Sequence, residues 1–124
     1  MKLFAIAIGG SIGALLRYAV SQFTSQSLAI NSFPMGTLFV NVSGCFIGGI
    51  ILGSFTSKFS QETRAFLVLG ILGSYTTFSS FGMETIGLVD DGKIKSAALY
   101  IFSTFLLTLI GVMLGYVLSK KIFN

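Results

Sequence analysis

The chain of 124 residues contains no histidine and no tryptophan, and it has only one cysteine and one proline. The absence of histidine excludes histidine-based catalytic and metal sites, and the single cysteine, Cys45, excludes an intramolecular disulfide. Charged residues make up 10% of the chain, against about 25% in a soluble domain. The sequence offers no credible nucleophile–base pair or metal-ligating cluster, so it argues against an enzyme.

Apolar residues dominate what is present. They make up 53% of the chain, and the mean hydropathy is +0.90. Four apolar stretches, at about 3–22, 35–56, 66–88 and 97–118, each approach the ~20 residues that a helix needs to cross a membrane. We therefore expect residues 1–124 to form one all-α transmembrane domain of four helices.

The connecting segments are short. Residues 23–33 are polar and uncharged and predict a loop, after which Pro34 fits the first turn of a helix with Ser32 as a candidate cap. Arg17 interrupts the first apolar stretch, and no clean cleavage site follows it, so we expect a retained helix rather than a signal peptide.

The basic residues flank the predicted helices, which indicates membrane anchoring and not nucleic-acid binding. The side that holds both termini carries Lys2, Lys58, Arg64, Lys120 and Lys121. The other side carries Lys93 and Lys95, with Arg17 near the end of the first helix. This bias weakly favours cytoplasmic termini, and it is small enough to permit insertion in both orientations.

The third stretch has an unusual centre. Residues 73–82 read Gly-Ser-Tyr-Thr-Thr-Phe-Ser-Ser-Phe-Gly and place five Ser and Thr hydroxyls near the expected midplane. Ser and Thr compete for backbone hydrogen bonds, so we predict a broken helix here. Broken helices at membrane depth line polar cavities or bind ions. The stretch therefore predicts a membrane protein that handles an ion.

Two further helices carry polar rows. Thr37 and Asn41 share one face of the second helix with Gly44 and Gly48. An amide facing lipid would be costly, so this face should meet protein or a pore. It either only holds neighbouring helices together by hydrogen bonds or also lines an ion path. Tyr100, Thr104 and Thr108 form a row on the fourth helix. That row is either a polar track or a set of hydroxyls bonded to their own helix.

Two charged residues fall inside spans. Arg17 is either an arginine that snorkels to the interface or an anion-attracting group at a vestibule. Glu84, four residues after Ser80, either reaches the interface or belongs to the ion path. Every span also contains a pair of small residues four apart, which predicts close helix packing and oligomerisation.

Three motifs occur in order along the chain. They are Gly9-Gly10-x-x-Gly13-Ala14-x-x-Arg17-Tyr18, Gly36-Thr37-Leu38-x-Val40-Asn41-x-x-Gly44-x-Phe46-x-x-Gly49 and Gly70-x-x-Gly73-x-x-Thr76-Thr77-Phe78-Ser79-Ser80-Phe81. Together, in a four-span chain, they resemble the CrcB/Fluc family of fluoride channels over essentially the whole length. The resemblance implies an antiparallel, dual-topology homodimer of oppositely inserted copies with two fluoride pores.

The resemblance also implies roles for particular residues. The implied fluoride-pore residues are Phe78, Phe81, Asn41, Ser80, Thr37, Tyr100, Thr104, Thr108 and Glu84. Arg17 would stand at the vestibule, and the carbonyls of Gly73 and Thr76 would hold a structural Na+ ion at the dimer interface. The implied function is passive fluoride export across the bacterial inner membrane, with fluoride, a second copy and the lipid bilayer as partners.

The chemistry of the residues fits this function. Hydroxyls and an amide are moderate donors that could replace the water around fluoride, and aromatic rings offer a positive edge. Two alternatives stay open. A small proton-coupled multidrug exporter would need an embedded carboxylate, for which Glu84 is the one candidate, and a non-transporting scaffold subunit would explain only the glycines.

Overall fold

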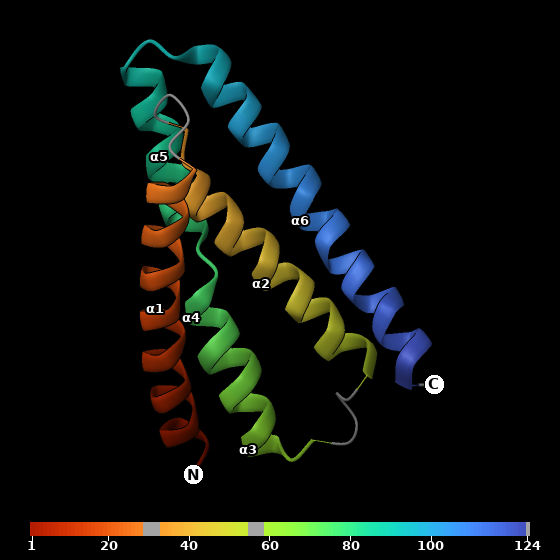
Figure 1. Cartoon of the computed structure of the whole chain (residues 1–124). Helices are drawn as coiled ribbons and strands as arrows, with labels where there is room; N and C mark the ends of the chain where they lie inside the picture. The colour runs from red at the N-terminus through yellow and green to blue at the C-terminus, as the bar shows by residue number, and fades with distance from the viewer. Residues whose placement is uncertain (29–32, 55–58, 124) are drawn as a thin grey trace.

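The computed structural model describes residues 1–28, 33–54 and 59–123, and every regular element among them is a helix (Figure 1). In order, these are α1 (Lys2–Ser27), α2 (Met35–Ser54), α3 (Gln61–Arg64), the π-helix η1 (Ala65–Leu72), α4 (Gly73–Tyr75), α5 (Phe78–Asp90) and α6 (Ile94–Phe123).

Among the described residues, four segments are long and apolar enough to cross a membrane. They are Lys2–Ser27, Met35–Gly53, Gln61–Asp90 and Ile94–Ile122. The third of them joins α3, η1, α4 and α5. The predicted number of spans is confirmed, and each predicted stretch falls on one of them. Large apolar side chains lie exposed along all four, as expected of a surface that faces lipid or a second chain.

The predicted loop at 23–33 is wrong in its first part. Helix α1 continues to Ser27, and the Leu28 N–H donates to the Thr24 carbonyl at 2.9 Å. Packing holds this polar turn in helical form, because Gly36 of α2 lies directly against Ser21 and Ser25. Three predictions fall outside the described residues: the candidate cap Ser32, the end of the second stretch at 55–56, and the position of Lys58.

The helices associate mainly in two groups. Helix α1 packs against η1 and α4 of the third span, and α2 packs against α6 (Figure 1). Glycines permit the close approach. A Cβ added to Gly115 would overlap the Phe46 carbonyl, and one added to Gly13 would overlap the Ile71 carbonyl. The predicted close packing through small residues is confirmed at both contacts.

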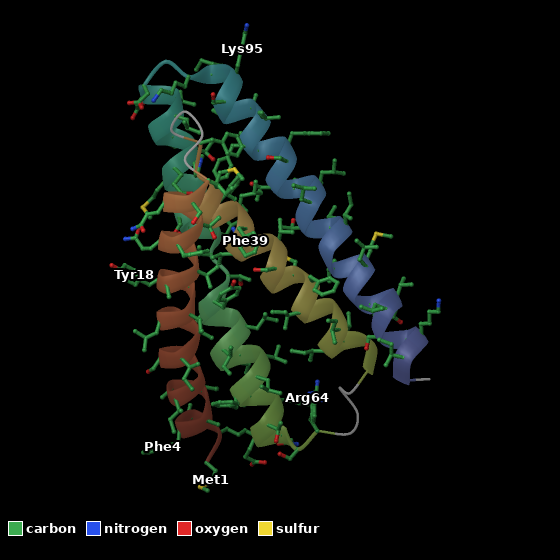
Figure 2. All side chains as sticks on the ribbon, viewed as in Figure 1. Met1, Phe4, Tyr18, Phe39, Arg64 and Lys95 are labelled. Carbon is green, nitrogen blue, oxygen red and sulfur yellow. The ribbon has the colours of Figure 1, made fainter. Side chains whose placement is uncertain are left out.

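Different segments of the chain lie at the two ends of the molecule. Both chain termini and the start of α3 lie at one end (Figure 1). Figure 2 shows Met1 and Arg64 at this end and Lys95 at the other. Between the two ends, α5 packs against α6 and closes a small core around the fully buried Tyr100.

Candidate functional site

The third span is interrupted at its centre. Helix α4 ends at Tyr75, and the next two residues have extended backbone angles: φ −77° and ψ 155° at Thr76, φ −150° and ψ 118° at Thr77. Helix α5 then begins at Phe78, and the Thr77 hydroxyl caps it by accepting a hydrogen bond from the Ser80 N–H at 3.2 Å. A threonine in this position satisfies one of the free N–H groups at a helix start.

Asn41 of α2 holds the extended residues in place. Its Nδ2 donates to the Thr77 carbonyl at 3.0 Å, and its Oδ1 accepts from the Thr77 N–H at 2.8 Å. Asn41 and Thr77 are both buried. The amide therefore takes the place of the helical neighbours that the Thr77 peptide has lost.

Two carbonyls lose their usual donors as a result. In an uninterrupted α-helix the Thr77 N–H would donate to the Gly73 carbonyl, and the Ser80 N–H would donate to the Thr76 carbonyl. Here the first donates to Asn41 and the second to the Thr77 hydroxyl. The interruption thus leaves the carbonyls of Gly73 and Thr76 without these bonds, and Gly73 lies exposed on the single chain.

Beside the interruption lies a cavity of about 250 Å³, the inner pocket. It is lined by Asn41 and Cys45 of α2, Thr76 and Thr77, Phe78 and Phe81 of α5, and Thr104, Phe105 and Thr108 of α6. The Phe78 and Phe81 rings lie 5.4 Å apart between centroids, tilted by 42°. Phe81 is partly buried, whereas Phe78 is 84% exposed in the single chain.

The two threonines of α6 in this pocket differ. The Thr108 hydroxyl donates to the Thr104 carbonyl at 2.7 Å, so it is satisfied within its own helix. The Thr104 hydroxyl is buried and has no partner among the described residues, and the residue is only 7% exposed. A buried hydroxyl without a partner is costly, which makes Thr104 a donor in this pocket that is free for a ligand.

A second cavity, of about 400 Å³, lies on the α1 side and is here called the vestibule pocket. Arg17 lines it together with Thr37, Ser80 and Glu84. Thr77 lines both this cavity and the inner pocket. Thr77 therefore forms part of the wall between a polar cavity lined by Arg17 and Glu84 and an inner pocket whose described lining has no charged residue.

Glu84 turns inward, toward α2 and α6. Its Oε1 accepts a hydrogen bond from the Thr37 hydroxyl at 2.7 Å, and its Oε2 accepts one from the Tyr100 hydroxyl at 2.6 Å. The Tyr100 ring packs against Phe81 and Phe33, with centroids 5.2 Å and 5.4 Å away. The carboxylate thus joins α2, α5 and α6.

The structure gathers most of the predicted site residues into one region. Tyr100 differs from the others on α6, because it lines neither pocket and contributes a hydrogen bond to Glu84. Sequence reasoning missed Ser43, whose hydroxyl lies 2.9 Å from that of Tyr75 and ties α2 to the last turn before the interruption. The alternation of hydroxyls with glycines on α2 gave no separate signal for it.

Comparison with known proteins agrees with this geometry. The family described as "CrcB-like protein, Camphor Resistance (CrcB)" matches residues 4–116. A relative from Parabacteroides distasonis, named Fluoride-specific ion channel FluC, is 43% identical over 98% of this chain and 95% of its own length. One of the same name from Thermus thermophilus is 43% identical over 90% of this chain and 87% of its own.

A third relative of that name, from Methylococcus capsulatus, is 42% identical over 98% of this chain, which spans 54% of that longer protein. The family match covers most of the chain and includes all the residues that line the two pockets. The chain therefore belongs to the family of CrcB-like proteins.

Proposed function

We propose that this chain is a fluoride-specific ion channel that lets fluoride cross a membrane passively. The observation that carries the proposal is the buried hydroxyl of Thr104, which has no partner in the described part of the chain and lies in a pocket walled by Phe78 and Phe81. Fluoride is small and strongly hydrated, so a pore must offer donors in place of water. The shared name of the relatives supports the same function.

The inner pocket suits conduction because its donors are moderate. A hydroxyl and an amide can replace water around the ion without binding it too tightly to leave. The positive edges of Phe78 and Phe81 add weak stabilisation and narrow the path against larger anions. Arg17 in the vestibule pocket would draw anions toward Thr77 and the inner pocket behind it.

We further propose that two oppositely inserted copies form the channel as a homodimer with two pores. Support comes from the single chain, in which the inner pocket borders a Phe78 side chain that is 84% exposed. A large, exposed apolar ring at the edge of a pocket that holds a buried, polar hydroxyl favours cover by a second chain over contact with lipid alone. The interruption of the third span would then lie close to the centre of the assembly.

The carbonyls of Gly73 and Thr76 would hold a structural Na+ ion between the copies. They fit a monovalent cation because both are freed from helical bonds, and carbonyl oxygens are hard ligands that suit such an ion. The ion would supply fixed positive charge between two anion paths. A well-resolved structure of the assembly with no cation density beside these carbonyls would contradict this part of the proposal.

In a bacterial inner membrane, such a channel would lower toxic cytoplasmic fluoride by letting it leave. The test is fluoride efflux from liposomes that contain the purified protein, measured with a fluoride electrode. We expect fast fluoride efflux, slow chloride efflux, and loss of the fluoride flux in an F78I/F81I variant. The matched control is F4I/F102I, which changes two exposed phenylalanines that line neither pocket.

Two results would count against the proposal. Undiminished flux in F78I/F81I would remove these rings from the pore, and equal chloride and fluoride flux would remove the selectivity. Proton-coupled drug efflux that is lost in Glu84→Gln would instead support the exporter alternative.

A further inference from the structure

A cavity of about 540 Å³ opens at the end of the molecule that holds both termini. Two cationic side chains line it, Lys2 at the start of α1 and Arg64 at the end of α3. Much of the remaining lining is apolar and comes from Leu52, Val68 and Leu69. Charge and apolar surface thus share one cavity between three segments of the chain.

The two cations are not neutralised by neighbours. Within the part of the chain that the structure describes, the ion pair joins Lys93 and Asp91 at 2.9 Å, at the opposite end. Neither Lys2 nor Arg64 forms an ion pair there. The described cations at the cavity's end are Lys2, Arg64, Lys120 and Lys121, against Glu62 as the one acidic residue. The described charged residues around the α5–α6 turn are Asp90, Asp91, Lys93 and Lys95, whose charges sum to zero.

We propose that this cavity binds an anionic phospholipid, with the phosphate between Lys2 and Arg64 and an acyl chain along the apolar lining. Arginine presents a planar set of donors that matches a phosphate, and lysine adds a second positive charge. Basic pockets between membrane helices favour anionic headgroups for this reason. A free anion would match the charges but would leave the apolar half of the cavity uncovered.

The positions of the lining residues along their spans suit a phospholipid. Lys2 and Arg64 lie at the ends of their spans, where headgroups are found, and Val68 and Leu69 follow about one helical turn deeper along the third span. At the same end, Lys120 lies 5.8 Å from the Tyr116 ring centroid, an arrangement typical of residues that anchor a helix at the membrane surface. This inference is independent of fluoride conduction.

The test is native mass spectrometry of the purified protein in detergent, titrated with phosphatidylglycerol or phosphatidylcholine. We expect phosphatidylglycerol to bind preferentially. A K2Q/R64Q variant should bind it about 30-fold more weakly, because each of the two lost cations should weaken the attraction to the anionic headgroup by a similar factor. The matched control K93Q/K95Q removes two lysines from the other end and should bind as the parent does. A charge-conserving K2R/R64K variant should also retain binding.

Several results would overturn the proposal. Equal binding of phosphatidylcholine would show that the headgroup charge is not recognised. Weakening by K93Q/K95Q to the same degree would show a general effect of net charge. Displacement of the lipid by millimolar inorganic phosphate would identify a free-anion site. A fall in dimer content of K2Q/R64Q without added lipid would identify an interface between copies.

Discussion

Asn41 and Thr77 are joined by two hydrogen bonds between a side-chain amide and a backbone peptide, at 3.0 Å and 2.8 Å. The pair lies 36 residues apart in sequence and fastens the second span to the centre of the third. One N–H of the amide is spent on the Thr77 carbonyl, which leaves its second N–H for another acceptor. Asn41 therefore positions the interruption in addition to lining the inner pocket.

Replacing Asn41 by alanine should destabilise the protein and reduce fluoride flux. The change leaves the buried N–H and carbonyl of Thr77 without partners, which costs about 1–3 kcal/mol. Stability would be measured by thermal unfolding in detergent and flux in liposomes. The control is Ser11→Ala, because that exposed hydroxyl bonds only to the Ala7 carbonyl of its own helix. Parental stability and flux in N41A would contradict the positioning role.

Replacing Gly115 by alanine should separate α2 from α6. An added Cβ would overlap the Phe46 carbonyl, and backbone atoms cannot rotate away as side chains do. We expect a loss of about 1–3 kcal/mol, as for other overpacked contacts. The measurement is the fraction of folded protein at increasing concentrations of a denaturing detergent.

Gly87→Ala provides the matched control for this change. No atom lies within 4 Å of a Cβ at this position in α5, so the substitution should be neutral or stabilise by about 0.5–1 kcal/mol. If both variants lost the same stability, the loss would come from helix propensity or from the detergent and not from the α2–α6 contact.

The number of spans and the glycine contacts were predictable because both follow from local patterns. A run of about 20 apolar residues marks a span, and small residues four apart mark a close contact. The face of α2 that carries Asn41 was also expected to meet protein, since an amide is costly in lipid. Its bonds to Thr77 agree with that argument.

Other features depend on partners that the sequence does not reveal. The last turn of α1 is polar, and its helical form rests on the contact of Gly36 with Ser21 and Ser25. The π-helical form of η1 has no signature, because its eight residues are as apolar as those of any buried helix. Likewise, nothing local indicated that Glu84 would face Tyr100, sixteen residues further along the chain.

Replacing Thr104 by valine should reduce fluoride flux without destabilising the protein. The hydroxyl has no partner among the described residues, so its removal relieves a buried polar group while the side-chain shape is kept. If the hydroxyl serves the ion, losing a bond to a charged ligand should slow the flux about tenfold or more. Thr108→Val is the control, because that hydroxyl already bonds to the Thr104 carbonyl. Equal flux in both variants would assign the unpaired hydroxyl no part in conduction.

Replacing Glu84 by alanine should destabilise the protein more than replacing it by glutamine. Alanine leaves the hydroxyls of Thr37 and Tyr100 without their acceptor, and these residues are 5% and 0% exposed. Each unsatisfied hydroxyl costs about 1–3 kcal/mol, whereas glutamine keeps one acceptor and the shape of the side chain. Adding T37V and Y100F to E84A removes the unpaired groups and should recover part of the loss, as seen in thermal unfolding. If the triple variant were no more stable than E84A, the carboxylate would act through packing, and the two hydrogen bonds would add little.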